Sequence, residues 1–172
     1  NRSNARPSGS AEALAALGVN VEAGVEQLEQ CLAQCRVAFL YAAKLHPAMK
    51  FAAPVRRAIG IRTIFNLIGP LTNPAGVRGQ LLGVSRVELA VPMLNPLREL
   101  GAERAMVVCG REGLCDVSIE GPTVAACWDG VGVSEHELSP ADFGLTQRPL
   151  AELTVSDADE SAARVRSGLA GE

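Results

Sequence analysis

A chain of 172 residues is long enough for one domain with a hydrophobic core, and 48% of its residues are apolar. Its formal net charge of −3, with 20% charged residues, gives no general reason to expect binding to nucleic acid or to an anionic membrane. No apolar run is long enough to span a membrane, and the polar segment that starts at Asn1 lacks the pattern of a secretion signal.

The five cysteines also bear on the class of protein. Their number is odd and they contain no Cys-x-x-Cys pair, which argues against a disulfide scaffold or a zinc cluster and favours a reducing, cytoplasmic compartment. Cys31 and Cys35 are four residues apart on a predicted helix, a spacing that could bring two metal ligands together. We favour the alternative that both are small buried apolar side chains.

The N-terminal third is predicted to contain a polar loop and two helices. Residues 1–10 form the loop, with Ser8 or Ser10 as the N-cap of a helix over Ala11–Leu17. Apolar residues at steps of three and four predict a second helix over Val25–Cys35. The apolar run Val37–Tyr41 is interpreted as a short buried strand.

The middle of the chain alternates helices and strands. Helical stretches are predicted at His46–Ile59 and Thr63–Leu71, followed by a strand over Gln80–Ser85, a helix over residues 86–100 and a strand over Ala105–Cys109. This alternation is typical of an α/β protein with a parallel sheet.

The C-terminal third is predicted to contain a β-hairpin and a last helix instead of alternating helices and strands. Two apolar runs, Val124–Trp128 and Val131–Leu138, flank the turn dipeptide Asp129-Gly130 and predict a hairpin. Ser156 and Asp159 resemble a capping box for a last helix that ends near Gly168. The absence of a linker predicts a single α/β domain over residues 1–172 with a mainly parallel sheet, flanking helices and a C-terminal hairpin.

Three segments carry more polar residues than a core requires. The loop over residues 1–10 could bind phosphate at a helix N-terminus, or it could be only a solvated, capped loop. In the second segment, Arg56 and Arg57 could pair with a carboxylate or a phosphate, or they could be surface charges. The third, Gly110–Asp116, follows a strand and could hold Mg²⁺ through its acidic groups, or it could be an ordinary glycine-rich connector.

Together these segments resemble the anthranilate phosphoribosyltransferase family. The likeness runs over the whole chain and is carried by four stretches: Asn1-Arg2-Ser3 with Ser8–Glu12, His46–Met49 with Pro54–Arg57, Gly60–Pro74, and Leu138–Leu145. The stretch Gly60–Pro74 is the most specific, because it matches the family pattern almost throughout. It contains Gly69-Pro70-Leu71-Thr72-Asn73-Pro74, although sequence of this kind also occurs in pyrimidine nucleoside phosphorylases.

The resemblance implies a large α/β domain beside a small helical domain. Most of the helical domain, the glycine-rich GTGGD loop that grips pyrophosphate, and the closing helices are not among these residues. We therefore expect residues 1–172 to be an interior piece, a partial α/β phosphoribosyltransferase domain, that does not turn over by itself. The resemblance implies a homodimer for a complete enzyme, but not for this piece alone.

The resemblance also implies a reaction and its site residues. The phosphoribosyl group of phosphoribosyl pyrophosphate passes to the amine of anthranilate, and Mg²⁺ neutralises the pyrophosphate that leaves. Asn1, Arg56 and Pro70 are implied to contact anthranilate, and no side chain is implied as a covalent catalyst. Phosphoribosyl pyrophosphate is implied to be bound by Asn1, Arg2, Ser3, Asn4, Ala5, Arg6 and Ser10.

One departure from the family pattern affects the metal site. The family has Asp-Glu where this chain has Cys115-Asp116, so one carboxylate is lost and the other is one methylene shorter. A thiolate is a poor ligand for Mg²⁺, and Arg111 stands where the family often has an acid. Two alternatives stay open. One is a truncated or decayed homologue that binds small anions without catalysis, which the missing loops and this altered pair favour; the other is a related pyrimidine nucleoside phosphorylase, which shares the architecture.

Overall fold

The computed structural model describes residues 9–48, 51–52, 54–55, 58 and 65–171. The chain divides into two compact units, one made of residues 1–62 with 154–172 and the other of residues 63–153. Each unit is described by itself. Within the described residues, no helix combines the length and the apolar character that a membrane span needs.

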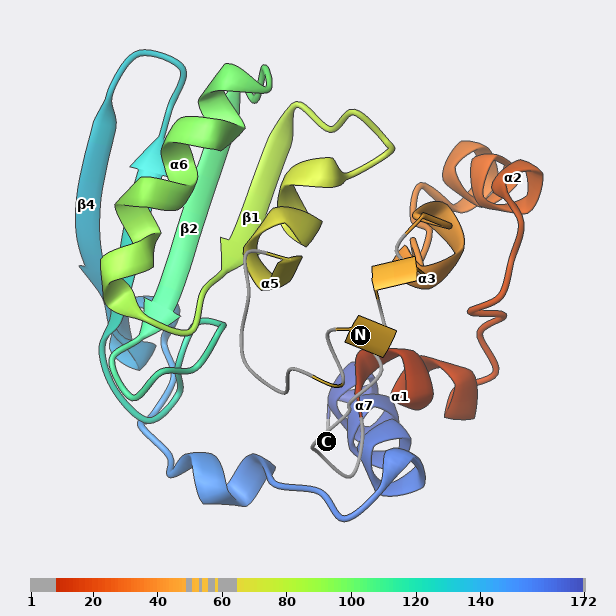
Figure 1. Ribbon diagram of the computed structural model, residues 1–172. Coiled ribbons are helices and arrows are strands. Elements are labelled where there is room, and N and C mark those ends of the chain that lie inside the picture. The colour runs from red at the N-terminus through yellow and green to blue at the C-terminus, as the bar shows by residue number, and fades with distance from the viewer. Residues whose placement is uncertain (1–8, 49–50, 53, 56–57, 59–64, 172) are drawn as a thin grey trace. The chain divides into compact units, whose positions relative to one another are not determined.

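The unit of residues 63–153 is built on a four-stranded sheet in the order β1-β2-β3-β4 (Figure 1). Only β1 and β2 pair in parallel, and the pairings β2–β3 and β3–β4 are antiparallel. The predicted α/β class and C-terminal hairpin are confirmed, but the described sheet is mixed rather than mainly parallel. Its strands are β1 (Gly79–Gly83), β2 (Arg104–Gly110), β3 (Thr123–Trp128) and β4 (Val133–Leu138).

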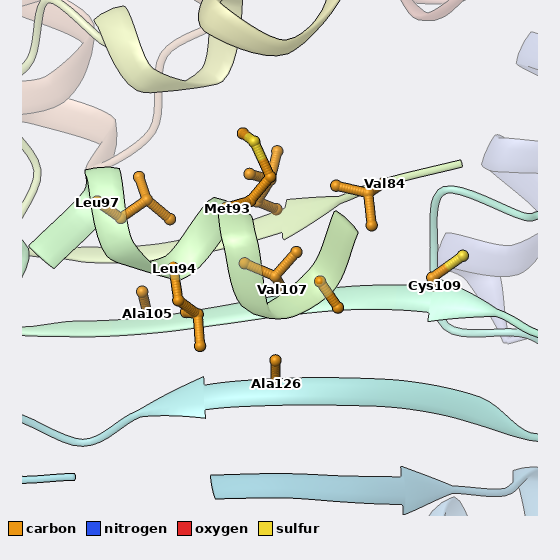
Figure 2. Close-up of a cluster of buried hydrophobic side chains, with 10 residues drawn as sticks. Val84, Met93, Leu94, Leu97, Ala105, Val107, Cys109 and Ala126 are labelled. Carbon is orange, nitrogen blue, oxygen red and sulfur yellow. The ribbon is translucent and has the colours of Figure 1, made fainter. Parts of the chain in front are cut away.

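One face of this sheet is covered by helix α6 (Ala90–Glu99), which follows the short 3-10 helix η2 (Val87–Leu89) (Figure 1). Because side chains alternate between the two faces of a strand, Ala105, Val107 and Cys109 of β2 all point toward α6. Figure 2 shows Ala105 and Val107 beside Leu94 of the helix, with Cys109 further along β2. Small and branched side chains thus fill the core between the helix and the sheet, as the low aromatic content of the sequence requires.

The same unit begins with helix α5 (Phe65–Ile68), which runs into the 3-10 helix η1 (Gly69–Thr72). It ends with the 3-10 helices η3 (Pro140–Phe143) and η4 (Leu150–Leu153). The helix predicted over Thr63–Leu71 is therefore present in its described part, but it tightens at Gly69-Pro70. Proline has no backbone N–H to continue an α-helical bond.

In the other unit, helices α1 (Ser10–Ala16) and α7 (Ala158–Ala170) lie side by side (Figure 1). The guanidinium Nη2 of Arg166 in α7 donates to the backbone carbonyl of Leu17 at 3.3 Å, just beyond the end of α1. The expected serine cap of α1 is wrong: Ser10 lies inside the helix, and Gly9 occupies the N-cap without a side-chain bond.

Helix α2 (Val25–Cys35) has the predicted bounds, and α3 (Ala42–Leu45) follows it. Cys31 and Cys35 are exposed, so the interpretation of both as buried side chains is wrong.

The strand expected at residues 37–41 is wrong too, since these residues have no regular structure. Val37 is 69% exposed there, and the rings of Phe39 and Tyr41 stack on each other instead of entering a sheet. The helix predicted over residues 46–59 lies partly outside the described residues; residues 51–52, 54–55 and 58 are helical.

The last helix, α7, begins one residue later than the capping pattern indicated. Its N-cap is Asp157, which accepts from the N–H of Glu160 at 2.8 Å, and the Glu160 carboxylate in turn accepts from the N–H of Ser156 at 2.8 Å. The helix also continues past Gly168, and Gly171 (φ +80°) ends it in the left-handed conformation.

The carboxylate of Glu160 makes the start of α7 sensitive to acid. Hydrogen bonds from the backbone and hydroxyl of Ser156, and then from Arg164, lower its pKa from 4.5 to about 2. A carboxyl group whose pKa is lowered by folding stabilises the native state above its unfolded pKa, and that contribution is lost as the pH falls from about 4.5 to about 2. We therefore expect Glu160→Gln to flatten the fall in melting temperature over this interval.

The measurement is thermal unfolding at several pH values between 2 and 6, with Asp159→Asn as the control. Asp159 lies in the same first turn of α7 and takes no part in these hydrogen bonds, so its variant should keep the wild-type slope. A carboxyl-carbon titration that finds Glu160 changing charge near pH 4.5 in the native protein would contradict the assignment.

Candidate functional site

The loop that joins β2 to β3 packs against the carboxyl end of β1. A Cβ atom added at Gly83, the last residue of β1, would lie 1.9 Å from the carbonyl oxygen of Cys115 and 2.5 Å from its carbonyl carbon. Just beyond this point the N–H of Val84 donates to the carbonyl of Val108 in β2 at 2.9 Å. The candidate metal loop thus lies where two parallel strands end, which is the usual place for ligands in α/β sheets.

A tight turn forms the first half of this loop. The N–H of Gly113 donates to the carbonyl of Gly110 at 2.8 Å, and the N–H of Gly110 donates to the carbonyl of Leu114 at 2.9 Å. Gly113 has φ +90°, a conformation that L side chains rarely adopt. The turn therefore explains why residue 113 is a glycine, and Cys115 and Asp116 remain the candidate metal ligands of this segment.

Cys115 and Asp116 are both exposed. One oxygen of the Asp116 carboxylate accepts from the N–H of Val117 at 3.0 Å. A carboxylate is a ligand that Mg²⁺ prefers, whereas a thiol is not, so Asp116 fits this ion and Cys115 does not. Among the residues that the structure describes, no group of three or more His, Cys, Asp or Glu side chains is arranged to hold a metal ion. Asp116 can therefore supply only part of a coordination shell, as is common where Mg²⁺ keeps waters and binds substrate phosphates.

Arg111, at the start of the loop, is held by an acid of β4. Its Nε donates to the Glu137 carboxylate at 2.7 Å, and its backbone N–H donates to the carbonyl of Pro122 at 3.0 Å. The positive charge at the position where the family often has an acid is thus paired with Glu137. Both side chains are more than half exposed, so the ion pair itself adds little stability.

Cys109 lies under the loop in the core. Burial raises the pKa of its thiol, and nearby Cys115, Glu112 and Glu88 raise it further. The thiol is therefore protonated at neutral pH, and a role as a thiolate nucleophile is not supported. Glu88 follows β1 and lies close enough to Cys109 to affect its pKa, a proximity that no local sequence pattern indicates.

Pro70 lies in the same unit as the loop but contacts a different part of β1. It is half-buried in η1, and its carbonyl accepts from the side-chain amide of Gln80 at 2.6 Å. Gln80 precedes Gly83 by three residues, or roughly 10 Å along a strand. The structure thus brings Pro70 and Cys115 to opposite ends of β1.

The remaining candidate residues are in the other unit. Ser10 is the exposed first residue of α1. The positions from Asn1 to Arg6, and Arg56 with its neighbour Arg57, lie outside the described residues. Their roles in substrate binding therefore stay predictions.

All of the chain, residues 1–172, matches the family model described as "Glycosyl transferase family, a/b domain". The chain belongs to this family. The result agrees with the mixed sheet and its flanking helices, and it confirms the resemblance inferred from the sequence motifs.

Relatives in this glycosyl transferase family carry a more specific name. The chain is 45% identical over 172 residues to anthranilate phosphoribosyltransferase of Rubrobacter xylanophilus, a match that covers 100% of this chain and 50% of the relative. It is 49% identical over 164 residues to anthranilate phosphoribosyltransferase of Xanthomonas campestris, covering 95% of this chain and 47% of the relative. The chain therefore spans about half the length of the curated relatives it matches.

Solved structures show the same relationship. The anthranilate phosphoribosyltransferase of Thermus thermophilus superposes with a TM-score of 0.88 and 41% identity, over 97% of this chain and 49% of that one. The Saccharomyces cerevisiae enzyme in complex with phosphoribosyl pyrophosphate and Mg superposes with a TM-score of 0.84 and 27% identity, over 97% of this chain and 46% of that one. The α/β fold is thereby confirmed.

Proposed function

We propose that this protein is an anthranilate phosphoribosyltransferase of tryptophan biosynthesis, which transfers the phosphoribosyl group of phosphoribosyl pyrophosphate to the amine of anthranilate and releases pyrophosphate. The observation that carries the proposal is the likeness, over all 172 residues, to a relative of that name. The proposal is tested by following anthranilate consumption and pyrophosphate release together, which should occur in equal amounts. We further propose that the full-length protein is a cytoplasmic homodimer.

Two groups of residues would bind the substrates. Arg56 would hold the carboxylate of anthranilate, because a planar guanidinium can form two parallel hydrogen bonds to it, and Asn1 and Pro70 would complete this side of the site. The other group would surround the phosphoribosyl end, as the motif likeness implies: Asn1, Arg2, Ser3, Asn4, Ala5, Arg6 and Ser10. Both assignments rest on the matching sequence motifs.

Binding and orientation would account for most of the catalysis. Substrates held in line need no covalent intermediate, so we propose no side chain as a nucleophile. Mg²⁺, when bound, supplies positive charge to the departing pyrophosphate. In this chain Asp116 would hold or orient that ion from the carboxyl end of the parallel strands, and Cys115 would contribute little.

The pair Cys115-Asp116 predicts an unusually high Mg²⁺ requirement. Cys115→Asp restores a hard oxygen ligand, so the Mg²⁺ concentration at half-maximal activity should fall, whereas Asp116→Ala should raise it. The measurement is activity against Mg²⁺ concentration for the three full-length proteins at fixed substrate concentrations. Three curves with one midpoint and one maximum would contradict a metal role for the loop and would favour a simple connector.

The same pair is the observation that favours a second candidate function, a non-catalytic homologue that binds small anions. Such a protein would bind phosphoribosyl pyrophosphate but would release no pyrophosphate from it at any Mg²⁺ concentration. Cys115→Asp distinguishes the two functions, because it should raise activity at limiting Mg²⁺ in an enzyme and leave a non-catalytic protein inactive.

A further inference from the structure

Two hydroxyl side chains are buried beside the exposed metal loop. Ser118 is 2% exposed and Thr123 is 0% exposed, whereas Cys115 and Asp116 are exposed. A buried hydroxyl is unfavourable unless it forms hydrogen bonds, so its presence here calls for a role in the structure around it.

The two hydroxyls fix the turn that follows Asp116. The Thr123 Oγ1 accepts from the N–H of Ser118 at 2.9 Å. The Ser118 Oγ accepts from the N–H of Glu120 at 3.0 Å and from the N–H of Gly121 at 3.3 Å. Because Thr123 is the first residue of β3, these bonds attach the turn to the start of an inner strand of the sheet.

Asp116 therefore lies between two attached points of the chain. On one side the backbone of Cys115 packs on Gly83 of β1, where not even a methyl group would fit. On the other side Ser118 is bonded to Thr123 of β3. The only residue between Asp116 and this second point is Val117, whose N–H is bonded to the Asp116 carboxylate. The backbone that carries the carboxylate is thus held from both β1 and β3.

We propose that Thr123 is a positioning residue for the metal loop: its hydroxyl holds Ser118 and thereby places the Asp116 carboxylate for a divalent cation bound with phosphoribosyl pyrophosphate. The inference rests on the metal role of Asp116 in the proposed function. Groups that orient a metal ligand without touching the metal commonly change metal affinity when they are removed.

The test uses the full-length protein with saturating phosphoribosyl pyrophosphate and measures Mn²⁺ binding by electron paramagnetic resonance, without turnover. Thr123→Val keeps the shape of the side chain but leaves the N–H of Ser118 without its acceptor, and it should raise the Kd for Mn²⁺ about tenfold. Thr123→Ser keeps the hydroxyl and should restore most of the affinity. Ser118→Ala removes the two bonds that the Ser118 hydroxyl accepts within the same turn, so it should also raise the Kd for Mn²⁺. It provides a second variant if Thr123→Val does not fold.

Val107→Ala is the control that separates a loss of metal positioning from a general loss of stability. Val107 is fully buried against α6, so this variant should lower stability by leaving a cavity, yet its Kd for Mn²⁺ should stay at the wild-type value. If the folded Thr123→Val and Ser118→Ala proteins bind Mn²⁺ like the wild type, or if Val107→Ala weakens binding equally, the positioning role is wrong.

Asp116→Ala distinguishes this inference from the function on which it rests. A raised Kd in Asp116→Ala together with unchanged values in the Thr123 and Ser118 variants would overturn the positioning role and leave the metal role of Asp116 intact. An unchanged Kd in Asp116→Ala would overturn both.

Discussion

Gly83→Ala is expected to destabilise the protein by about 3 kcal/mol, because overpacking a filled site costs 1–3 kcal/mol or more. The added Cβ would lie 1.9 Å from the carbonyl oxygen of Cys115, and this neighbour is backbone, which cannot turn aside as a flexible side chain can. The strand or the loop must move. We therefore also expect the variant to need more Mg²⁺, since the residue that follows Cys115 is Asp116.

The matched control is Gly79→Ala at the other end of the same strand. A Cβ at Gly79 would meet nothing within 4 Å, and its backbone does not have a positive φ, so the change should shift stability by less than about 1 kcal/mol. Urea unfolding of the two variants measures the difference. Equal stabilities for the Gly83 and Gly79 variants would show that the loop does not pack on β1.

Arg56→Ala is expected to have the largest effect on the reaction. Loss of a charge-assisted hydrogen bond to the anthranilate carboxylate should cost about 1.5–3 kcal/mol, which corresponds to a fall of roughly 10- to 150-fold in kcat/KM for anthranilate. The effect should be concentrated on anthranilate, with the KM for phosphoribosyl pyrophosphate nearly unchanged. Arg56→Lys should recover only part of the loss, because an ammonium group lacks the planar fork of a guanidinium.

Arg57→Ala is the control for Arg56, since it removes the same charge one residue further along the chain. We expect it to change kcat/KM for anthranilate much less. The steady-state kinetics of both variants, varied in each substrate separately, provide the comparison. An unchanged KM and kcat for anthranilate in Arg56→Ala would remove this residue from the binding site.

The elements that could be predicted from the sequence are those whose signals are local. The apolar spacing of residues 25–35 gave the bounds of α2, and Asp129-Gly130 gave the turn between β3 and β4. The apolar run at residues 37–41 has a strand-like composition, but a strand also needs pairing partners that a local pattern does not reveal. The start of α7 was misplaced by one residue because Ser156 and Asp157 are both good caps, and the reciprocal bond from Glu160 decides between them.

In the candidate site, too, the local features could be predicted from the sequence and the contacts between distant residues could not. Its place after β2 follows from a strand and a glycine-rich turn, which are visible in the sequence. The contact between Gly83 and Cys115, and the pairing of Arg111 with Glu137, join residues that are far apart in the chain. Such contacts depend on which strands become neighbours, so sequence spacing alone could not reveal them. The bond between Ser118 and Thr123 spans only five residues, but no sequence pattern indicates that both hydroxyls are buried and hydrogen-bonded.

The central claim is that the full-length protein joins anthranilate to the phosphoribosyl group. Its most direct test is to incubate the protein with anthranilate, phosphoribosyl pyrophosphate and Mg²⁺ and to quantify the N-phosphoribosyl product and pyrophosphate in the same sample, with uridine and phosphate offered in a parallel sample. We expect product and pyrophosphate to appear in a 1:1 ratio only when anthranilate is present, with no cleavage of uridine. Phosphorolysis of uridine, or binding of phosphoribosyl pyrophosphate without any product across a full range of Mg²⁺ concentrations, would contradict the claim.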